Sequence, residues 1–539
     1  MQGGEITFTT KSRNRGRISA IAATAAFAVV LSAVLLFAVM DYETSEGAIG
    51  DEFTWDGMVY TITDETNKTV TLTKGADIKS VSLPHIAKKG SDEYRVTAIG
   101  EKAFFDMKNV EKVTIHAHSL EVIGKEAFRG CSALNMINIP TSVTAIEYAA
   151  FGSCSALVSI ELQPAIITIG KEAFRDSGIT GIVIHENVKT LEYRTFFNCT
   201  SLKSVDMPSV TQVKEGAFYL CTSLKTVNMP AISSLGTGAF GFCESLESIA
   251  LPDAVKIIED DTFGKCKKLA SATFPGVTSI GARAFKDCLS LTAIELPSGL
   301  TTIGKEAFRG CTPIASVYIP SKVSNIGDSA FFDCSGSVAS VEVSADNANY
   351  SSVDGMLFDK GKTKLIQGCN AGEVKIPSTV TAFKEWAFYE CRSVKTLFFL
   401  GDSSPVFGEQ SLNMGDRTID AYAKFDDPKP GDFVCSETKV TFFKLKDKYN
   451  VTIAAMPNGK IKPTGATHQV DTGGDLLIEA VPDKGYKLKS LSLDGNPVVT
   501  VGNKYTITFV VSDVQVTAEF EPDGSPTPPP GDSSALIIA

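Results

Sequence analysis

Histidine is scarce in this chain of 539 residues, which has only five: His85, His116, His118, His185 and His468. His116 and His118 alternate at the end of one expected strand, and neither has a cysteine or an acidic residue at zinc-ligand spacing. The loop FDDPKPGD at 425–432 lacks the acidic spacing of a calcium loop. We therefore expect no metal site and no metal cofactor.

Catalytic motifs and basic clusters are also missing. The sequence contains no G-x-S-x-G, H-E-x-x-H or GxxxxGK[ST] motif, and no GxGxxG in a strand–helix context. It has 51 Lys and Arg against 62 Asp and Glu, a formal net charge of -11. A body of this charge repels phosphate backbones unless a basic stripe offsets the repulsion, and none is evident. We predict that the chain is not an enzyme, needs no cofactor and does not bind nucleic acid.

One long apolar run stands near the N-terminus. Residues 18–40 are free of charge and follow a basic segment, Lys11, Arg13, Arg15 and Arg17. As a helix they would extend roughly 34 Å, enough for a bilayer core of ~30 Å. We expect a cytoplasmic basic tail at 1–17 and a transmembrane signal anchor at 18–40, with the bulk of the chain outside the cell. A cleaved signal peptide, which usually has a shorter apolar region, is the alternative.

Internal repetition organises the middle of the chain. IGKEAFRGC at 123–131 recurs at 303–311, and IGKEAFRDS stands between them at 169–177. Twelve copies align on one phenylalanine, at positions 104, 128, 151, 174, 196, 218, 240, 263, 285, 308, 331 and 388. The first eleven are 22–24 residues apart. Such a period indicates a solenoid, because no single unit could bury enough surface to fold alone.

Each copy reads V-x-x-I-G-x-x-A-F-x-x-C-x-x-L-x-x-V-x-I-P. Its second half alternates as a short strand, for example Val205-Asp206-Met207, and the following proline ends that strand. The A-F-x-x-C-x-x-L segment has apolar residues every three to four positions, which predicts one or two helical turns. The expected core of the repeat includes Phe128, Cys131, Phe151, Cys154, Phe218, Cys221, Phe308 and Cys311.

On these residues the chain resembles the leucine-rich-repeat surface proteins of the BspA-like, or Treponema pallidum, type. The resemblance covers 96–400. It implies an α/β leucine-rich-repeat solenoid of about 12 repeats of 22–24 residues, opened by a β-rich N-terminal cap at 48–95. The insertion VEVSADNANYSSVDGMLFDKGKTKLI, near 341–367, resembles a hairpin insertion of the family. Met107 and Ser177 replace the repeat cysteine and are able to pack in its place.

The C-terminal part has a different pattern. Residues 401–448 are irregular, and we expect a C-terminal cap or connector there. Residues 449–522 read as about five alternating strands separated by turns and resemble an internalin B-repeat-like module, which implies a small β-grasp-like domain. Residues 523–539 form a Pro-rich stalk. Its last apolar residues, 535–539, leave open a second membrane segment beyond this sequence.

The twelve cysteines favour a ladder of buried thiols over a disulfide framework. Ten of them occupy one repeat slot, three residues after the phenylalanine. A slot that faces the core suits a small apolar side chain, and free cysteine behaves as one. Neighbouring coils of a parallel ladder also do not offer the Cβ directions that a disulfide needs. Cys369 and Cys435 lie outside the slot, and a bridge between them is an alternative.

The remaining candidate for function is the surface formed by the strands. Their middle residues should face solvent, and the flanking outward positions are mostly Ser or Thr. We choose four of the middle residues as candidate ligand contacts: Asp206, Glu295, Tyr318 and Glu342. We expect a monomeric cell-surface adhesion or binding protein for an extracellular protein or glycan. A structural envelope spacer without a specific ligand is the second hypothesis, and an enzyme without a recognisable motif is the third.

Overall fold

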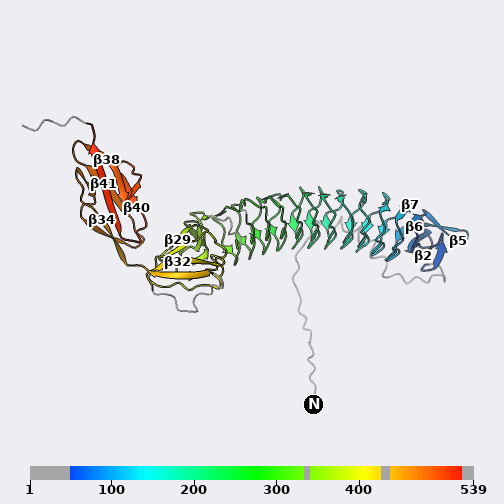
Figure 1. Ribbon diagram of the computed structural model, residues 1–539. Coiled ribbons are helices and arrows are strands. Elements are labelled where there is room, and N and C mark those ends of the chain that lie inside the picture. The colour runs from blue at the N-terminus through cyan, green and yellow to red at the C-terminus, as the bar shows by residue number, and fades with distance from the viewer. Residues whose placement is uncertain (1–48, 313, 333–339, 426–437, 525–539) are drawn as a thin grey trace, which may run out of the picture. The chain divides into compact units, whose positions relative to one another are not determined.

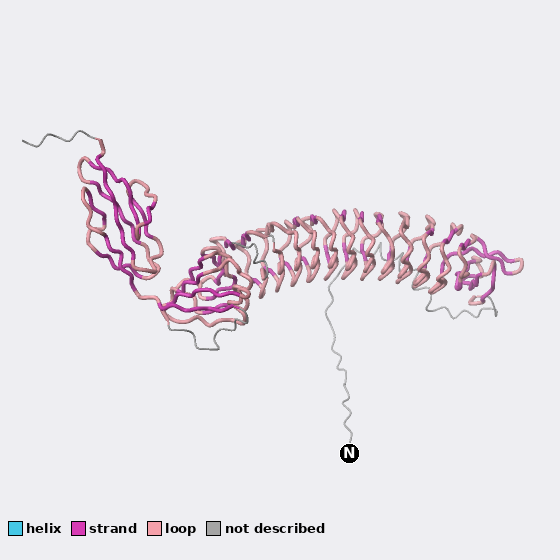
Figure 2. Tube along the Cα trace, viewed as in Figure 1, coloured by secondary structure: helices cyan, strands magenta, loops and turns pink. Residues whose placement is uncertain are grey.

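The computed structural model describes residues 49–312, 314–332, 340–425 and 438–524. These residues form strands and turns and contain no helix (Figures 1 and 2). The expected basic tail, the signal anchor at 18–40 and most of the Pro-rich stalk lie outside the described residues. Over the part of the chain that is described, no helix could span a membrane.

Most coils of the solenoid contribute to two parallel ladders. We call the first the Ile-Gly ladder, because most of its two-residue strands end just before the repeat glycine. Its strands are β8 (Val122–Ile123), β10 (Ala145–Ile146), β11 (Thr168–Ile169), β13 (Thr190–Leu191), β15 (Gln212–Val213), β17 (Ser234–Leu235), β19 (Ile257–Ile258), β21 (Ser279–Ile280), β22 (Thr302–Ile303), β24 (Asn325–Ile326) and β30 (Ala382–Phe383). These strands were not expected from the sequence.

The second ladder contains the alternating strands that the sequence predicts, and we call it the face ladder. Its strands are β4 (Ser80–Leu83), β7 (Lys112–Ile115), β9 (Met136–Ile137), β12 (Gly181–Val183), β14 (Ser204–Asp206), β16 (Thr226–Asn228), β18 (Ser248–Ala250), β20 (Ser271–Thr273), β23 (Ser316–Ile319), β25 (Ser340–Val343), β29 (Glu373–Ile376), β31 (Thr396–Phe399), β32 (Arg417–Ala423) and β33 (Thr438–Lys444). Its inward side chains are mostly buried and its outward ones mostly exposed. Those outward side chains make up the strand face.

The solenoid begins with strands of mixed direction and contains one hairpin insertion. The strands at its start are β1 (Glu52–Trp55), β2 (Met58–Asp64), β3 (Thr69–Lys74), β5 (Ile86–Lys89) and β6 (Asp92–Ile99). β3 and β6 pair in parallel, and the other pairs among these strands are antiparallel. β6 pairs in parallel with β8 and so starts the Ile-Gly ladder. The insertion consists of β26 (Tyr350–Val353), β27 (Met356–Asp359) and β28 (Lys364–Gln367). β28 returns the chain to the array by pairing in parallel with β30.

The array continues past the twelfth phenylalanine. The Phe388 amide donates to the Ser411 carbonyl at 2.8 Å, so a further coil stacks on the last Phe-aligned copy. β31, β32 and β33 pair in parallel and extend the face ladder into the region that looked irregular in sequence. The repeat pattern hid this coil because Leu412 stands where the other copies have phenylalanine.

The prediction of helical turns in the A-F-x-x-C-x-x-L segment was wrong, and with it the α/β class. In the coil of Phe128, the amides of Ala127, Arg129 and Cys131 each donate to the carbonyl three residues earlier and so close successive four-residue turns. The amides between them donate to the next coil: Phe128 bonds the Ala150 carbonyl at 2.8 Å. Glu126 and Gly130 have positive φ, at 54° and 79°. A helix is excluded because left-handed residues interrupt it and alternate amides are used by the neighbouring coil.

The repeat phenylalanines form one continuous stack through the core. From Phe104 to Phe331, each ring lies 4.8–5.7 Å from the next by centroid, with interplanar angles of 1–21°. Phe128, Phe151, Phe218 and Phe308 are completely buried. The ring spacing is close to the ~4.8 Å between hydrogen-bonded strands, so the same rise fits both the ladders and the rings.

The nine repeat cysteines that the structure describes are free and completely or almost completely buried, and eight of them donate a hydrogen bond to the preceding coil, while Cys334 lies outside the described residues. The Cys131 thiol donates to the Phe104 carbonyl of the preceding coil at 2.9 Å, and the Cys154 thiol donates to Phe128 at 3.1 Å. The same bond recurs at Cys221 and at Cys311. The slot therefore uses the thiol as a donor between coils as well as a small apolar group. Cys369 is also free and buried, while Cys435 lies outside the described residues.

Burial keeps most of these thiols protonated. It raises the pKa of Cys131 to about 12 and raises the pKa of Cys221 well above its usual value. Cys199 is the exception: burial opposes its thiolate, but hydrogen bonds from Cys221 and Ser177 outweigh that effect and lower its pKa. Its side chain has no solvent exposure, so a reagent cannot reach it in the folded chain.

The C-terminal residues form two sheets around a common core. Their strands are β34 (Lys448–Ile453), β35 (Gly459–Lys462), β36 (Thr467–Asp471), β37 (Leu476–Pro482), β38 (Tyr486–Leu493), β39 (Asn496–Val498), β40 (Lys504–Ile507) and β41 (Val514–Pro522). One sheet has the order β36-β34-β41-β38-β39 and the other has the order β35-β37-β40. Val451, Ile478 and Val516 belong to their shared core. There are thus more strands than the expected five, and the β-grasp-like assignment stays a prediction.

The turn geometry can be tested at Ser153, an exposed residue with φ of 58° that matches Gly130 in its repeat position. We expect Ser153→Gly to be more stable than Ser153→Ala by about 1 kcal/mol, because alanine is strained in the left-handed region. A helix would give the opposite order by a similar amount. Urea denaturation followed by circular dichroism measures the difference. Greater stability of the alanine variant would contradict the turn assignment.

The thiol ladder predicts a sharp contrast in reactivity. In the folded full-length chain at pH 8, the ten described cysteines should not react with a soluble disulfide reagent, because they are buried. All twelve should react after unfolding in guanidinium under reducing pretreatment. Mass spectrometry of labelled peptides identifies each thiol. Labelling of Cys131, Cys221 or Cys311 in the folded chain at the rate of a free thiol would refute the ladder.

Candidate functional site

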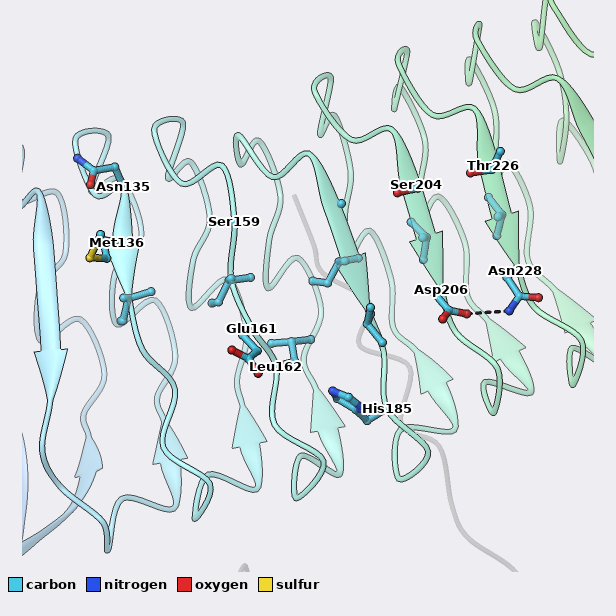
Figure 3. Close-up of a pocket in the computed structure, with 17 residues that line it drawn as sticks. Asn135, Met136, Ser159, Glu161, Leu162, His185, Ser204, Asp206, Thr226 and Asn228 are labelled. Carbon is cyan, nitrogen blue, oxygen red and sulfur yellow. Dashed lines mark hydrogen bonds between the residues drawn. The ribbon is translucent and has the colours of Figure 1, made fainter.

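A groove crosses five neighbouring coils of the strand face. It has a volume of about 920 Å³ and is lined by residues from 135–137, 159–162, 181–185, 204–206 and 226–228 (Figure 3). Its walls come from the outward positions of β9, β12, β14 and β16 and from the unpaired coil segment 159–162. The small residues Ser159, Gly181 and Ser204 belong to this lining and leave space for the groove. We call this site the face groove.

The face groove lies where the face ladder is interrupted. Among the described residues, Ser159–Leu162 has no backbone hydrogen bond to β9 or to β12. The nearest link is the Thr180 amide, which donates to the Val158 carbonyl at 3.0 Å. The main-chain donors and acceptors of Ser159–Leu162 therefore remain available in the wall of the groove.

A shortened turn accompanies this interruption. In most coils the face strand starts eight residues after the repeat phenylalanine, as Ser204 does after Phe196, but Gly181 follows Phe174 by only seven. The shorter path runs through Ser177 and Gly178. A Cβ on Gly178 would stand 2.2 Å from the Ser155 carbonyl oxygen, so this close approach to the preceding coil requires glycine. The short turn thus leads into β12, which has no ladder pairing to Ser159–Leu162.

The face groove combines exposed apolar side chains with acidic ones. Met136 is 54% exposed and Val183 is 48% exposed, which is unusual for large apolar groups on a strand. Glu161 and Asp206 are exposed beside them, and His185 is half-buried. Asn228 donates to the Asp206 carboxylate at 2.7 Å, which fixes that side chain (Figure 3). None of the described lining residues is Lys or Arg, so the groove has a negative character.

The four residues chosen from the sequence do not form one site. All are exposed on the strand face, and Tyr318 pairs in register with Glu342 between β23 and β25. Glu295 has the equivalent position one coil earlier. It lines a second cavity of about 640 Å³, whose lining also includes Leu251. Only Asp206 belongs to the face groove. Sequence reasoning missed Met136 and His185, although Met136 is an apolar residue in a column that is otherwise mostly serine or threonine.

The described residues bring no group of three His, Cys, Asp or Glu side chains together as a metal site. His85 and His118 lie 6.0 Å apart by ring centroid, and His116 is exposed. The face groove therefore offers groups for non-covalent binding: main-chain donors and acceptors, two carboxylates and two exposed apolar side chains. These are the elements of a binding surface for an extended ligand.

Comparisons with known proteins agree with this architecture. Residues 91–203, 121–247, 233–358 and 360–414 match the family described as BspA type leucine rich repeat region, and residues 449–524 match the divergent InlB B-repeat domain. None of the curated proteins matches the chain.

Several solved structures are similar. A leucine-rich repeat protein from Bacteroides ovatus is 26% identical with a TM-score of 0.51, and the match covers 73% of this chain and 100% of that one. A leucine rich cell surface protein from Faecalibacterium prausnitzii is 20% identical with a TM-score of 0.30, covering 74% and 78%. The T. pallidum leucine rich repeat protein is 23% identical with a TM-score of 0.26, covering 45% and 91%.

The family match extends over more than half of the sequence and coincides with the stacked coils. The first of these structures shares the fold over its whole length. The chain therefore belongs to the proteins with BspA-type leucine-rich repeats and carries a C-terminal divergent InlB B-repeat domain.

Proposed function

We propose that this protein is a cell-surface binding protein that engages an extracellular protein or glycan through the strand face, with the face groove as its main contact. The observation that carries the proposal is the 920 Å³ groove with unpaired main-chain groups in its wall. A solenoid that served only as a rod would not need an interrupted ladder at this place. No step of catalysis is part of the proposal, because no hydrogen bond joins a serine and His185 among the described residues that line the groove.

The location outside the cell is part of this proposal. It is supported by the apolar run at 18–40 and its basic flank, which lie outside the described residues. The acidic groove suits a partner that presents basic and apolar groups, because complementary charge steers encounter and excludes wrong partners. Adhesion is the physiological role that such a tethered binding surface would serve.

The groove can be filled without disturbing the core. Ser204 lines it, and Ser248 occupies the same outward position two coils later but outside the groove. Both side chains are exposed, so neither substitution removes buried contacts. We expect Ser204→Tyr to weaken binding of the full-length chain to intact cells or matrix-coated surfaces at least about tenfold, because lost pocket contacts cost roughly 1.4 kcal/mol or more.

Ser248→Tyr is the matched control and should bind as the unchanged chain does. Binding is measured as a saturation curve on the surface, and both variants are first compared by thermal unfolding. Equal loss of binding in the two variants would show that any bulk on the strand face interferes. Unchanged binding in Ser204→Tyr would remove the face groove from the proposal.

The spacer hypothesis is favoured by the small outward side chains in the second half of the strand face, such as Ser271, Ser316 and Ser340, which offer little contact area. It differs in its prediction for the patch at Tyr318. If this patch also contacts a ligand, Tyr318→Ala with Glu295→Ala and Glu342→Ala should weaken the same saturable binding about three- to tenfold. A spacer would show no saturable binding to lose, and the variants would match the unchanged chain throughout.

A further inference from the structure

A further, smaller cavity lies beside the A-F-x-x-C turns of neighbouring coils. It has a volume of about 220 Å³ and is lined by Tyr219, Phe242, Asp261, Gly264, Lys265, Arg283 and Lys286. Small-molecule pockets usually measure roughly 300–1,000 Å³, so this one suits a single ring-sized group. It shares no residue with the face groove. We call it the edge notch.

Two glycines open the edge notch. The position after the repeat phenylalanine carries a side chain in most coils, and in successive coils it reads Arg175, Phe197, Tyr219, Gly241, Gly264, Lys286 and Arg309. The two glycines interrupt this row between an aromatic ring and a lysine. A Cβ on Gly241 would stand 2.7 Å from the Tyr219 ring, so the position of that ring depends on glycine here.

Aromatic rings form one wall. The Tyr219 ring stacks on Phe197 at 5.8 Å and meets Phe242 at 5.1 Å with an interplanar angle of 54°. Tyr219 and Phe242 are both half-buried, so part of each ring remains open. Burial, followed by the nearby Asp261 carboxylate, raises the pKa of Tyr219 and keeps its hydroxyl protonated. No other described residue is hydrogen-bonded to that hydroxyl.

The rest of the lining is mostly cationic, in a chain whose net charge is -11. Lysine and arginine provide three of the lining residues and aspartate one. Arg283 binds Asp261 through two hydrogen bonds of 2.9 and 2.7 Å, and Lys286 pairs with Glu306 at 2.9 Å. Lys265 has no ion pair among the described residues, and its ammonium lies 4.8 Å from the Phe242 ring centre. One lysine is thus left to bind an anion.

These groups select a ligand class. The C–H face of a sugar ring can pack against Tyr219 and Phe242, as apolar surface does on aromatic rings. Its hydroxyls can donate to Asp261, whose carboxylate accepts more hydrogen bonds than Arg283 supplies, and can accept from the Tyr219 hydroxyl. An acidic substituent would pair with Lys265. A bare phosphate would leave the rings without contact and would be repelled by Asp261.

We propose that the edge notch binds one residue of an acidic glycan, through a sugar ring that bears a carboxylate. The site is independent of the face groove, so it holds whether or not that groove binds a partner. Each attachment is weak because the contact is small, and several such sugars along one glycan would be needed for retention at a surface.

The test uses the full-length chain in mild detergent and the probe methyl β-glucuronide, with methyl β-glucoside as the uncharged counterpart. Saturation-transfer NMR titrations should give a dissociation constant in the millimolar range for the glucuronide, and one at least about fivefold larger for the glucoside. Equal affinity for the two sugars would overturn the proposal, as would no binding of either. Inorganic phosphate that displaces the glucuronide at equal concentration would also overturn it, because the rings would then contribute nothing.

The matched variants are Lys265→Gln and Lys171→Gln. Lys171 is an exposed lysine four coils earlier that forms no ion pair with another described residue. Lys265→Gln should weaken glucuronide binding about five- to tenfold and leave glucoside binding unchanged, while Lys171→Gln changes neither. An equal loss in both variants would contradict a specific contact. Thermal unfolding of each variant verifies that the fold is retained, since neither lysine belongs to the core.

Discussion

The hydrogen bonds between successive coils are the constraint on which this structure depends. In the turn segment the amides alternate: one closes a local turn and the next donates to the carbonyl of the neighbouring coil, as Phe128 does to Ala150. This pattern requires left-handed residues such as Glu126, whose strain of roughly 1–2 kcal/mol is tolerated because its amide bonds the Tyr148 carbonyl. The phenylalanine stack and the thiol bonds follow the same rise.

Both candidate sites arise where the repeat departs from its own pattern. The turn at Ser177 and Gly178 is one residue short, and the face ladder opens into the face groove beside it. At the edge notch, Gly241 and Gly264 remove two successive side chains from a row that is occupied in most coils. A perfectly regular solenoid would present continuous ladders of side chains. Function in such an array is therefore to be sought at the exceptions and not in the consensus.

The sequence predicts the repeat, the buried phenylalanines and cysteines, and the alternating face strands, because each has a periodic signature. It does not predict the turn conformation, since A-F-x-x-C-x-x-L has the apolar spacing of a helix and the competing bonds come from the next coil. The Ile-Gly strands have only two residues each, too few for an alternation to be seen. The coil around Leu412 was hidden by its missing phenylalanine.

The candidate site was only partly predictable, for a related reason. Asp206 and Val183 belong to the expected outward column, but nothing in that column distinguishes a flat face from a groove. The feature that accompanies the groove is the short turn at Ser177-Gly178. In sequence, Ser177 looks like a conservative replacement of the repeat cysteine. Tyr318 attracts notice as an exposed aromatic residue, yet it lies outside both cavities on this face.

The central claim is that each coil is an interchangeable unit held by bonds to its neighbours, and removing one whole coil tests it most directly. Phe196 and Phe218 are one repeat apart, so deleting 197–218 joins two coils in register. Thermal unfolding followed by circular dichroism should show that this shortened chain keeps the cooperative transition of the stacked coils, whereas deleting 197–207, about half a coil, should lose it. The account is contradicted if the two deletions are equally disruptive, or if the half-coil deletion is the better tolerated.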